Sequence, residues 1–188
     1  MGREQSGEVG VFPKRGAREL AMTQDEWDTS QDAKAMLRAL YEEQPEYFGK
    51  QTQQLHRYLI ACCWKHKKLI PQTGLRDGLK GAIDWIEKKI DDNELNRLNW
   101  YAEADAFLLD YGKDPDATAE IEAQIANTST LKGMKFDEAR ECLKKAAYFA
   151  EGSMIYPQLN PGPWIESLFE SDFVCPDLLR EHLNPSFD

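Results

Sequence analysis

The residues with the clearest chemical potential are the adjacent cysteines Cys62 and Cys63 and the nearby His66. On a helix, Cys62 and His66 are four residues apart and therefore share a face. Both side chains are zinc ligands in other proteins, and His56 and Cys142 are further ligands that the fold could add. A closed zinc site needs four ligands, and this spacing supplies only two. We therefore predict a buried thiol beside a core histidine and no bound metal, with a metal site at Cys62 and His66 as an alternative.

A catalytic role for either adjacent cysteine is not predicted. A reactive thiolate needs exposure and a positively charged neighbour, whereas Cys62 and Cys63 lie in an apolar stripe between Leu55 and Ile70. Among the carboxylates, Asp105 lies nearest an apolar face, and we interpret it as a structural partner of His66, an arginine or a tryptophan amide. A small enzyme centred on Cys62, His66 and Asp105 stays open as an alternative.

Known catalytic and cofactor motifs are missing from the sequence. It contains no glycine-rich phosphate loop, no G-x-S-x-G elbow and no H-E-x-x-H pair. These absences favour a non-enzymatic role, and we assign neither a catalytic residue nor a cofactor.

A second candidate site is a basic stretch in an acidic protein. The formal net charge is -10, yet residues 47–76 contain lysines and arginines and neither Asp nor Glu. Such a face fits an acidic protein partner or a nucleic-acid backbone, although it could instead pair with the chain's own acidic helices. The residues predicted to bind a partner are Arg57, Trp64, Lys65, Lys67 and Lys68.

Overall charge and cysteine usage narrow the class of protein. A net charge of -10 disfavours general binding of nucleic acid or anionic lipid, because the long-range field repels both. The four cysteines form no C-x-x-C pair, which is typical of reduced thiols in a cytoplasmic protein. The longest apolar run, Tyr58 to Trp64, is too short to span a membrane, and no signal peptide is expected. The oligomeric state is not indicated.

Apolar periodicity predicts helices along most of the chain. Thr23 and Glu26 have the spacing of a capping box, and the 92–111 segment is apolar nearly all round, which predicts a central buried helix. Three prolines in residues 154–164 predict an extended wrap over the surface. The expected helices cover residues 32–43, 51–70, 74–90, 92–111, 116–126, 136–151, 163–170 and 176–182.

Together these elements predict an all-α fold, an irregular multi-helix bundle of about six main helices with a Pro-rich C-terminal wrap. Residues 1–21 have no periodic apolar face and are expected to form a flexible arm. Residues 22–188 are expected to form a single helical domain. We expect the 51–70 and 74–90 helices to form an antiparallel pair on the 92–111 helix, with Gly78 and Gly81 marking a close helix approach.

Several short segments resemble a large paralogous family of uncharacterised planctomycete proteins. MTQDEW at Met22–Trp27 is similar to the family's M-T-x-x-E-W opening, and SQDAKAML resembles its P-x-x-M-L segment without the proline. LHRYLIACCWKH resembles the R-L-F-A-C-A-C-C-R-R helix, without the first cysteine, and LLREHLNPSF resembles L-L-R-x-x-x-x-N-P-F with an inserted serine. The resemblance implies a helical cytoplasmic protein, supplies no catalytic residue and favours Met22 as the natural start.

The resulting hypothesis is a cytoplasmic protein–protein interaction or assembly module. A small enzyme or metal-binding protein at Cys62 and His66 is one alternative. Nucleic-acid binding through residues 50–76 is the other.

Overall fold

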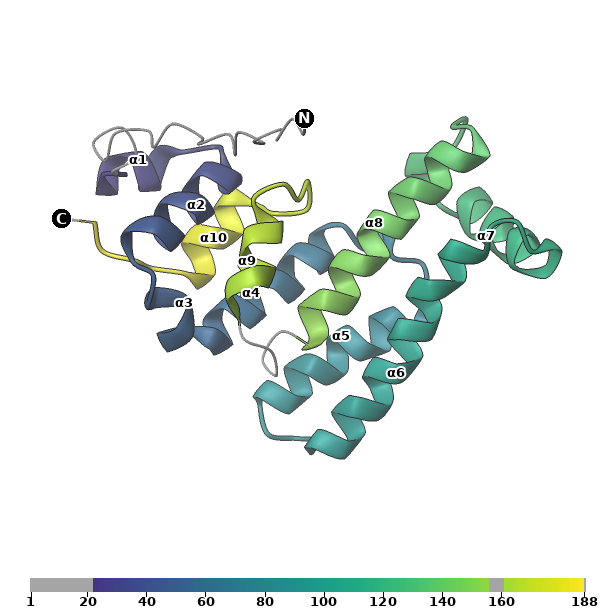
Figure 1. Ribbon diagram of the computed structural model, residues 1–188, viewed down its shortest axis with the longest axis horizontal. Helices are drawn as coiled ribbons and strands as arrows, with labels where there is room; N and C mark the ends of the chain where they lie inside the picture. Colours follow the sequence, from purple (N-terminus) through teal and green to yellow (C-terminus); the bar gives the residue numbers. More distant parts are fainter. Residues whose placement is uncertain (1–21, 156–160, 188) are drawn as a thin grey trace, which may run out of the picture.

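The computed structural model describes residues 22–155 and 161–187, and Figure 1 shows that these residues are helical throughout with connecting turns. The prediction of an all-α multi-helix bundle is confirmed, since the described residues contain ten α-helices and no strand. The predicted arm at residues 1–21 lies outside the described residues. The helices are α1 (Gln24–Thr29), α2 (Ala33–Glu43), α3 (Tyr47–Lys50), α4 (Thr52–Lys65), α5 (Thr73–Ile86), α6 (Asp92–Leu108), α7 (Pro115–Asn127), α8 (Phe136–Ile155), α9 (Pro161–Leu168) and α10 (Pro176–His182), with short 3-10 turns η1 (Lys67–Leu69), η2 (Leu109–Tyr111) and η3 (Ser129–Leu131).

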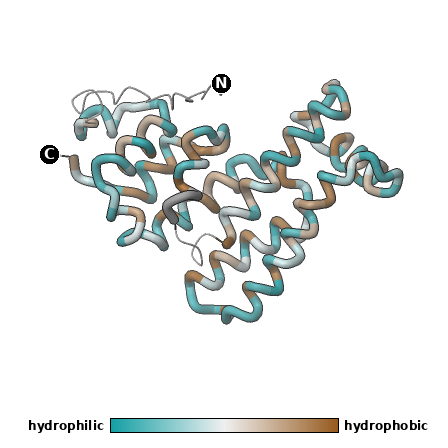
Figure 2. Tube along the Cα trace, in the orientation of Figure 1, coloured by the Kyte–Doolittle hydropathy of each residue, from teal (hydrophilic) through white to brown (hydrophobic). Residues whose placement is uncertain are grey.

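Side-chain caps start several of these helices where the sequence predicts them. The capping box at α1 is complete, because Thr23 Oγ1 accepts from the Glu26 N–H and the Glu26 carboxylate accepts from the Thr23 N–H. Asp32 and Asp91 cap α2 and α6 by accepting backbone N–H groups of the first turn. Figure 2 shows hydrophobic and hydrophilic residues alternating along most helices, the pattern of amphipathic packing.

The C-terminal helices return to the N-terminal ones. Helix α10 packs against α4 and α2, and α9 packs against α2 (Figure 1). Arg180 donates from Nη1 to the carbonyl oxygens of Trp27, at 3.2 Å, and Ser30, at 2.8 Å. The Phe187 ring lies 5.4 Å from that of the buried Trp27. These contacts join the two ends of the described chain.

The prediction of a central, buried 92–111 helix is wrong, since α8 is the helix that packs against α4, α5, α6 and α7. Helix α4 is packed by α8 on one side and α10 on another, and even Ile60, which lies off its main stripe, is buried. Helix α6 buries mainly small or single aliphatic side chains. Its aromatic side chains stay outside: Trp100 is 64% exposed, Tyr101 47% and Phe107 45%. An apolar pattern on all sides therefore did not indicate burial here.

Two glycines on α5 allow α6 and α8 to approach it closely. A Cβ at Gly81 would lie 2.2 Å from Leu98 Cδ1 of α6, and a Cβ at Gly78 would lie 2.4 Å from Met154 Cε of α8. The predicted close helix approach at both glycines is confirmed. The predicted α4–α5 pairing is the smaller contact, because α5 packs most extensively on α6 and α4 packs mainly on α8 and α10.

The Pro-rich segment is more helical than the sequence predicts. Helix α8 continues through Gly152 to Ile155, and α9 begins at Pro161. Proline is compatible with a first helical turn, where its missing N–H would have no intrahelical partner. The extended wrap is therefore wrong for residues 154–155 and 161–164, and the intervening residues 156–160 lie outside the described chain.

Candidate functional site

A thiol–imidazole cluster forms where the start of α10 meets α4. Tyr58, Cys62 and His66 follow one another at helical spacing on one face of α4. Cys175, the residue just before α10, lies on this face. Its Sγ is 3.6 Å from His66 Nε2, and its backbone N–H donates to Tyr58 Oη at 3.1 Å. Cys62 lies between Tyr58 and His66 on this face, and its side chain interacts electrostatically with that of Cys175. The structure thus adds Cys175 to the predicted pair of Cys62 and His66.

The cysteines of this region differ in their electrostatics. Cys62 and Cys63 are buried, as predicted, and burial raises the pKa of both thiols, that of Cys63 to about 12. The interaction with Cys62 lowers the pKa of Cys175, and His66 and Lys65 add to this effect against the opposing effect of burial. Negative charge is therefore favoured on Cys175, beside a positively charged lysine, and disfavoured on the adjacent pair.

Sequence reasoning missed Cys175 because 109 residues separate it from His66. Pro176 at the first position of α10 indicates a helix start there. No local pattern shows which helix that start packs against.

The additional metal ligands considered from the sequence do not join the cluster. His56 is buried, with neither ring nitrogen hydrogen bonded to a described residue, and Cys142 is half-buried on α8. In residues 22–155 and 161–187, no group of three or more His, Cys, Asp or Glu side chains is arranged to hold a metal ion. The geometry gives the metal alternative no support within these residues.

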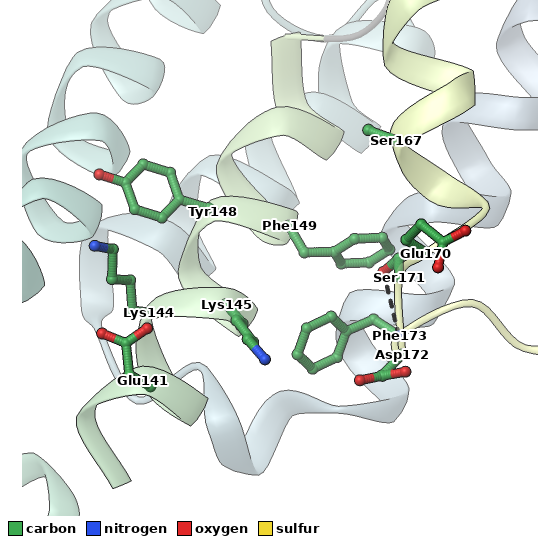
Figure 3. Close-up of a pocket in the computed structure, with 10 residues that line it drawn as sticks. All are labelled: Glu141, Lys144, Lys145, Tyr148, Phe149, Ser167, Glu170, Ser171, Asp172 and Phe173. Atoms are coloured by element: carbon green, nitrogen blue, oxygen red, sulfur yellow. Dashed lines mark hydrogen bonds between the residues drawn. The ribbon is translucent and has the colours of Figure 1, made fainter. Parts of the chain in front are cut away.

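A groove lies beside the thiol–imidazole cluster, separated from it by the Phe173 ring. The Phe173 ring lies edge-on to His66 at 5.3 Å and also contacts Phe149 at 5.3 Å. Beyond Phe173, an open groove of about 370 Å³ runs between α8 and the turn after α9 (Figure 3). Figure 3 shows Lys145 on the α8 wall and Asp172 on the opposite wall, beside Phe173. The groove therefore combines an aromatic floor with charges of both signs.

Some cations of the basic stretch form ion pairs or hydrogen bonds within the protein, and others do not. Lys50 pairs with Glu46 at 2.6 Å and Arg57 pairs with Glu87 at 3.5 Å. Arg76 donates to the carbonyl oxygens of Ile70, at 2.6 Å, and Lys67, at 3.2 Å. Pairing with the chain's own acidic helices thus accounts for Arg57 and does not extend to every cation of the stretch.

Three lysines remain at the end of α4 and in η1. Lys65, Lys67 and Lys68 are exposed, and none of them forms an ion pair with the described residues. We call these three residues the lysine cluster. Trp64, at its edge, is half-buried against the core. The turn that carries Lys67 lies beside η3, which is followed by the exposed Lys132.

Asp105 has a structural role, but its partner is none of those expected. Its Oδ2 accepts from the Gly74 N–H at 2.7 Å, at the start of α5, where Gln72 makes no side-chain cap. Asp105 therefore caps α5 from the neighbouring helix α6 and is not brought to His66. The constellation of Cys62, His66 and Asp105 is not formed.

Replacement of Asp105 by alanine is expected to lower the free energy of unfolding by about 1 kcal/mol, because the first turn of α5 loses its acceptor. Urea unfolding followed by circular dichroism measures the change. Asp105→Asn keeps an acceptor oxygen and is expected to recover most of the loss. Equal destabilisation by both variants would contradict the capping role.

Comparison with known proteins gives no relative for this chain: no protein-family model, curated protein or solved structure matches it. Within the described residues, none of the helices has the length and apolar character needed to cross a membrane. The function must therefore be argued from the sites themselves.

Proposed function

We propose that this protein is a non-enzymatic interaction module that docks an acidic protein segment on the lysine cluster, with Trp64 and Arg57 at its border. The observation that carries the proposal is the exposure of Lys65, Lys67 and Lys68 without an ion pair to any described residue. Most arginines of the described chain have a carboxylate or carbonyl partner, for example Arg57 with Glu87. The lysine cluster brings its three cations together within residues 65–68, which concentrates positive charge for another molecule there.

The charge balance favours an acidic protein segment over a nucleic acid. The chain carries a formal net charge of -10, so its long-range field repels a polyanion such as DNA. A short acidic segment has fewer charges and reaches the cluster locally, where three cations are close in sequence. The half-buried Trp64 adds an apolar contact at the edge, as is common in protein interfaces.

We also propose that the protein is cytoplasmic and that it is related to the planctomycete family whose motifs it resembles. All four cysteines are free thiols in the structure, which supports the cytoplasm, where thiols stay reduced. The resemblance to the planctomycete family would also place the protein there. That relation rests on the short motifs around Met22, Cys62 and Phe187.

A labelled glutamate-rich peptide tests the docking site directly. Fluorescence anisotropy is expected to show binding to the wild-type protein that weakens as salt is added, because the contact is electrostatic. The Lys65→Glu/Lys68→Glu variant is expected to bind at least about 10-fold more weakly, corresponding to about 1.4 kcal/mol. Unfolding curves of the variant should match the wild type, since both side chains are exposed.

Lys88→Glu/Lys113→Glu is the matched control. It makes the same change in net charge at two exposed lysines that form no ion pair with described residues. Equal loss of peptide binding in both variants would show a response to net charge alone and would overturn the docking site. Binding of a single-stranded oligonucleotide, but not of the acidic peptide, would favour the nucleic-acid alternative.

A further inference from the structure

The cluster of Cys175, Cys62 and His66 has the composition of a thiol redox site. We propose that Cys175 and Cys62 form a reactive dithiol that reduces small hydroperoxides, in which Cys175 is the attacking sulfur, Cys62 is the resolving sulfur and His66 accepts the Cys175 proton. This activity is separate from docking on the lysine cluster and stands or falls independently of it.

The geometry assigns the attacking role to Cys175. Its Sγ faces His66 Nε2 at 3.6 Å, so the imidazole can take the thiol proton and hold the resulting thiolate as an ion pair. The Tyr58 hydroxyl accepts from the Cys175 backbone N–H at 3.1 Å and fixes the chain at this point. The lowered pKa of Cys175, which arises first from Cys62 and then from His66 and Lys65, agrees with this assignment.

Cys62, and not Cys63, is placed to resolve the oxidised sulfur. Cys62 lies between Tyr58 and His66 on one face of α4, and both of these residues contact Cys175, at 3.1 and 3.6 Å. Cys63 lies about 100° further around the helix, where its side chain interacts with Ser153 of α8. The adjacent cysteines therefore have different partners, one toward α10 and one toward α8.

The burial of Cys175 limits the size of the oxidant that can reach its sulfur. Cys175 is 4% exposed, and the neighbouring His66 is half-buried. A hydroperoxide is small enough to reach a sulfur that is nearly covered, whereas a bulky thiol reagent is excluded. Cys62 is fully buried behind it, so it reacts with Cys175 and not with solvent.

The chemistry balances in two steps. The Cys175 thiolate attacks one oxygen of the hydroperoxide, the O–O bond breaks, and the leaving oxygen takes the proton held by His66 to give water or an alcohol. The Cys62 sulfur then attacks the Cys175 sulfenic acid, an S–S bond forms, and the S–O bond breaks to release water with the Cys62 proton. The two thiols lose two electrons in total, and the hydroperoxide gains them.

Stoichiometric hydrogen peroxide added to the reduced, full-length protein tests the proposal. Intact mass spectrometry is expected to show loss of two hydrogen atoms, and peptide mapping is expected to find Cys62 joined to Cys175. In Cys62→Ala, the Cys175 sulfenic acid should persist and be trapped by dimedone, because its resolving sulfur is gone. His66→Gln is expected to slow the oxidation about 10-fold, since its proton acceptor is lost.

Cys142→Ser is the matched control, because Cys142 lies on α8 outside the cluster, and it should form the disulfide at the wild-type rate. If a variant fails to fold, the mass change and the peptide map of the wild-type protein still test the proposal. Oxidation of Cys142 ahead of Cys175, a disulfide between any other pair, or a Cys175 rate equal to that of an unstructured cysteine peptide would overturn the proposal.

Discussion

Acidification from pH 6.5 towards 4 is expected to lower the free energy of unfolding by up to about 3 kcal/mol through a single residue, His56. Burial lowers the pKa of His56 from 6.5 to about 4, and the adjacent positive charge of Arg57 adds to the shift. Neither ring nitrogen makes a well-formed hydrogen bond to a described residue, and the Ser153 backbone opposes the shift only in part.

The sign follows from the protons bound in each state. Between pH 4 and 6.5, His56 of the unfolded chain is protonated while His56 of the folded chain is neutral. The unfolded state therefore binds more protons, and stability rises with pH across this interval and levels off above it. The carboxylates with lowered pKa values, such as Glu26 and Asp110, lose their stabilising contribution only as the pH falls below their ordinary pKa values of 4.5 and 3.8.

Urea unfolding at several pH values measures the effect. His56→Leu removes the titrating group and is expected to flatten the dependence between pH 4.5 and 6.5. His182→Gln changes a histidine at the end of α10, keeps His56, and should retain the wild-type dependence. An unchanged slope in His56→Leu would show that another group causes the acid sensitivity.

Replacement of Leu59 by alanine is expected to destabilise the protein by about 3 kcal/mol, because this side chain of α4 is fully buried. Replacement of the larger Trp100 by alanine is expected to cost about 0.5 kcal/mol or less, because Trp100 is 64% exposed on α6. Chemical unfolding at two protein concentrations measures both. A loss of several kcal/mol for Trp100→Ala would contradict the exposure of this side chain.

Helix positions were predictable from the sequence because caps and periodicity are local signals. The capping box of Thr23 and Glu26 identifies a helix start that the structure confirms, and the expected start at residue 92 is that of α6. The end of α8 was not predictable in the same way, since Gly152 lies within the helix and is buried. Tertiary packing there outweighs the low helix propensity of glycine.

The choice of central helix was not predictable, because hydropathy counts apolar residues without showing which helix faces which. Helix α6 has aromatic residues that remain outside, such as Trp100, and Tyr111 just after it is exposed as well. Helix α4, which carries Arg57 and Lys65, is covered because both α8 and α10 pack on it. That arrangement depends on long-range contacts, for which a single sequence carries no local signal.

Only the part of the candidate site that lies on one helix was predictable from the sequence. Helical spacing alone is enough to place Cys62 and His66 on one face. Cys175 and the capping contact of Asp105 with Gly74 come from other helices. Their partners follow from how helices pack and not from spacing along the chain.

The packing of the C-terminal helix α10 on the N-terminal helices has a consequence during synthesis. Helices α1 and α4 emerge from the ribosome early, but Arg180 and Cys175, which complete their contacts, are translated late. Until α10 leaves the exit tunnel, the apolar surfaces that it covers stay open to chaperones and to other nascent chains. A ribosome stalled before Pro176 would therefore hold a chain in which α10 does not yet cover the core. The Cys62 and Cys175 thiols would not yet be in contact.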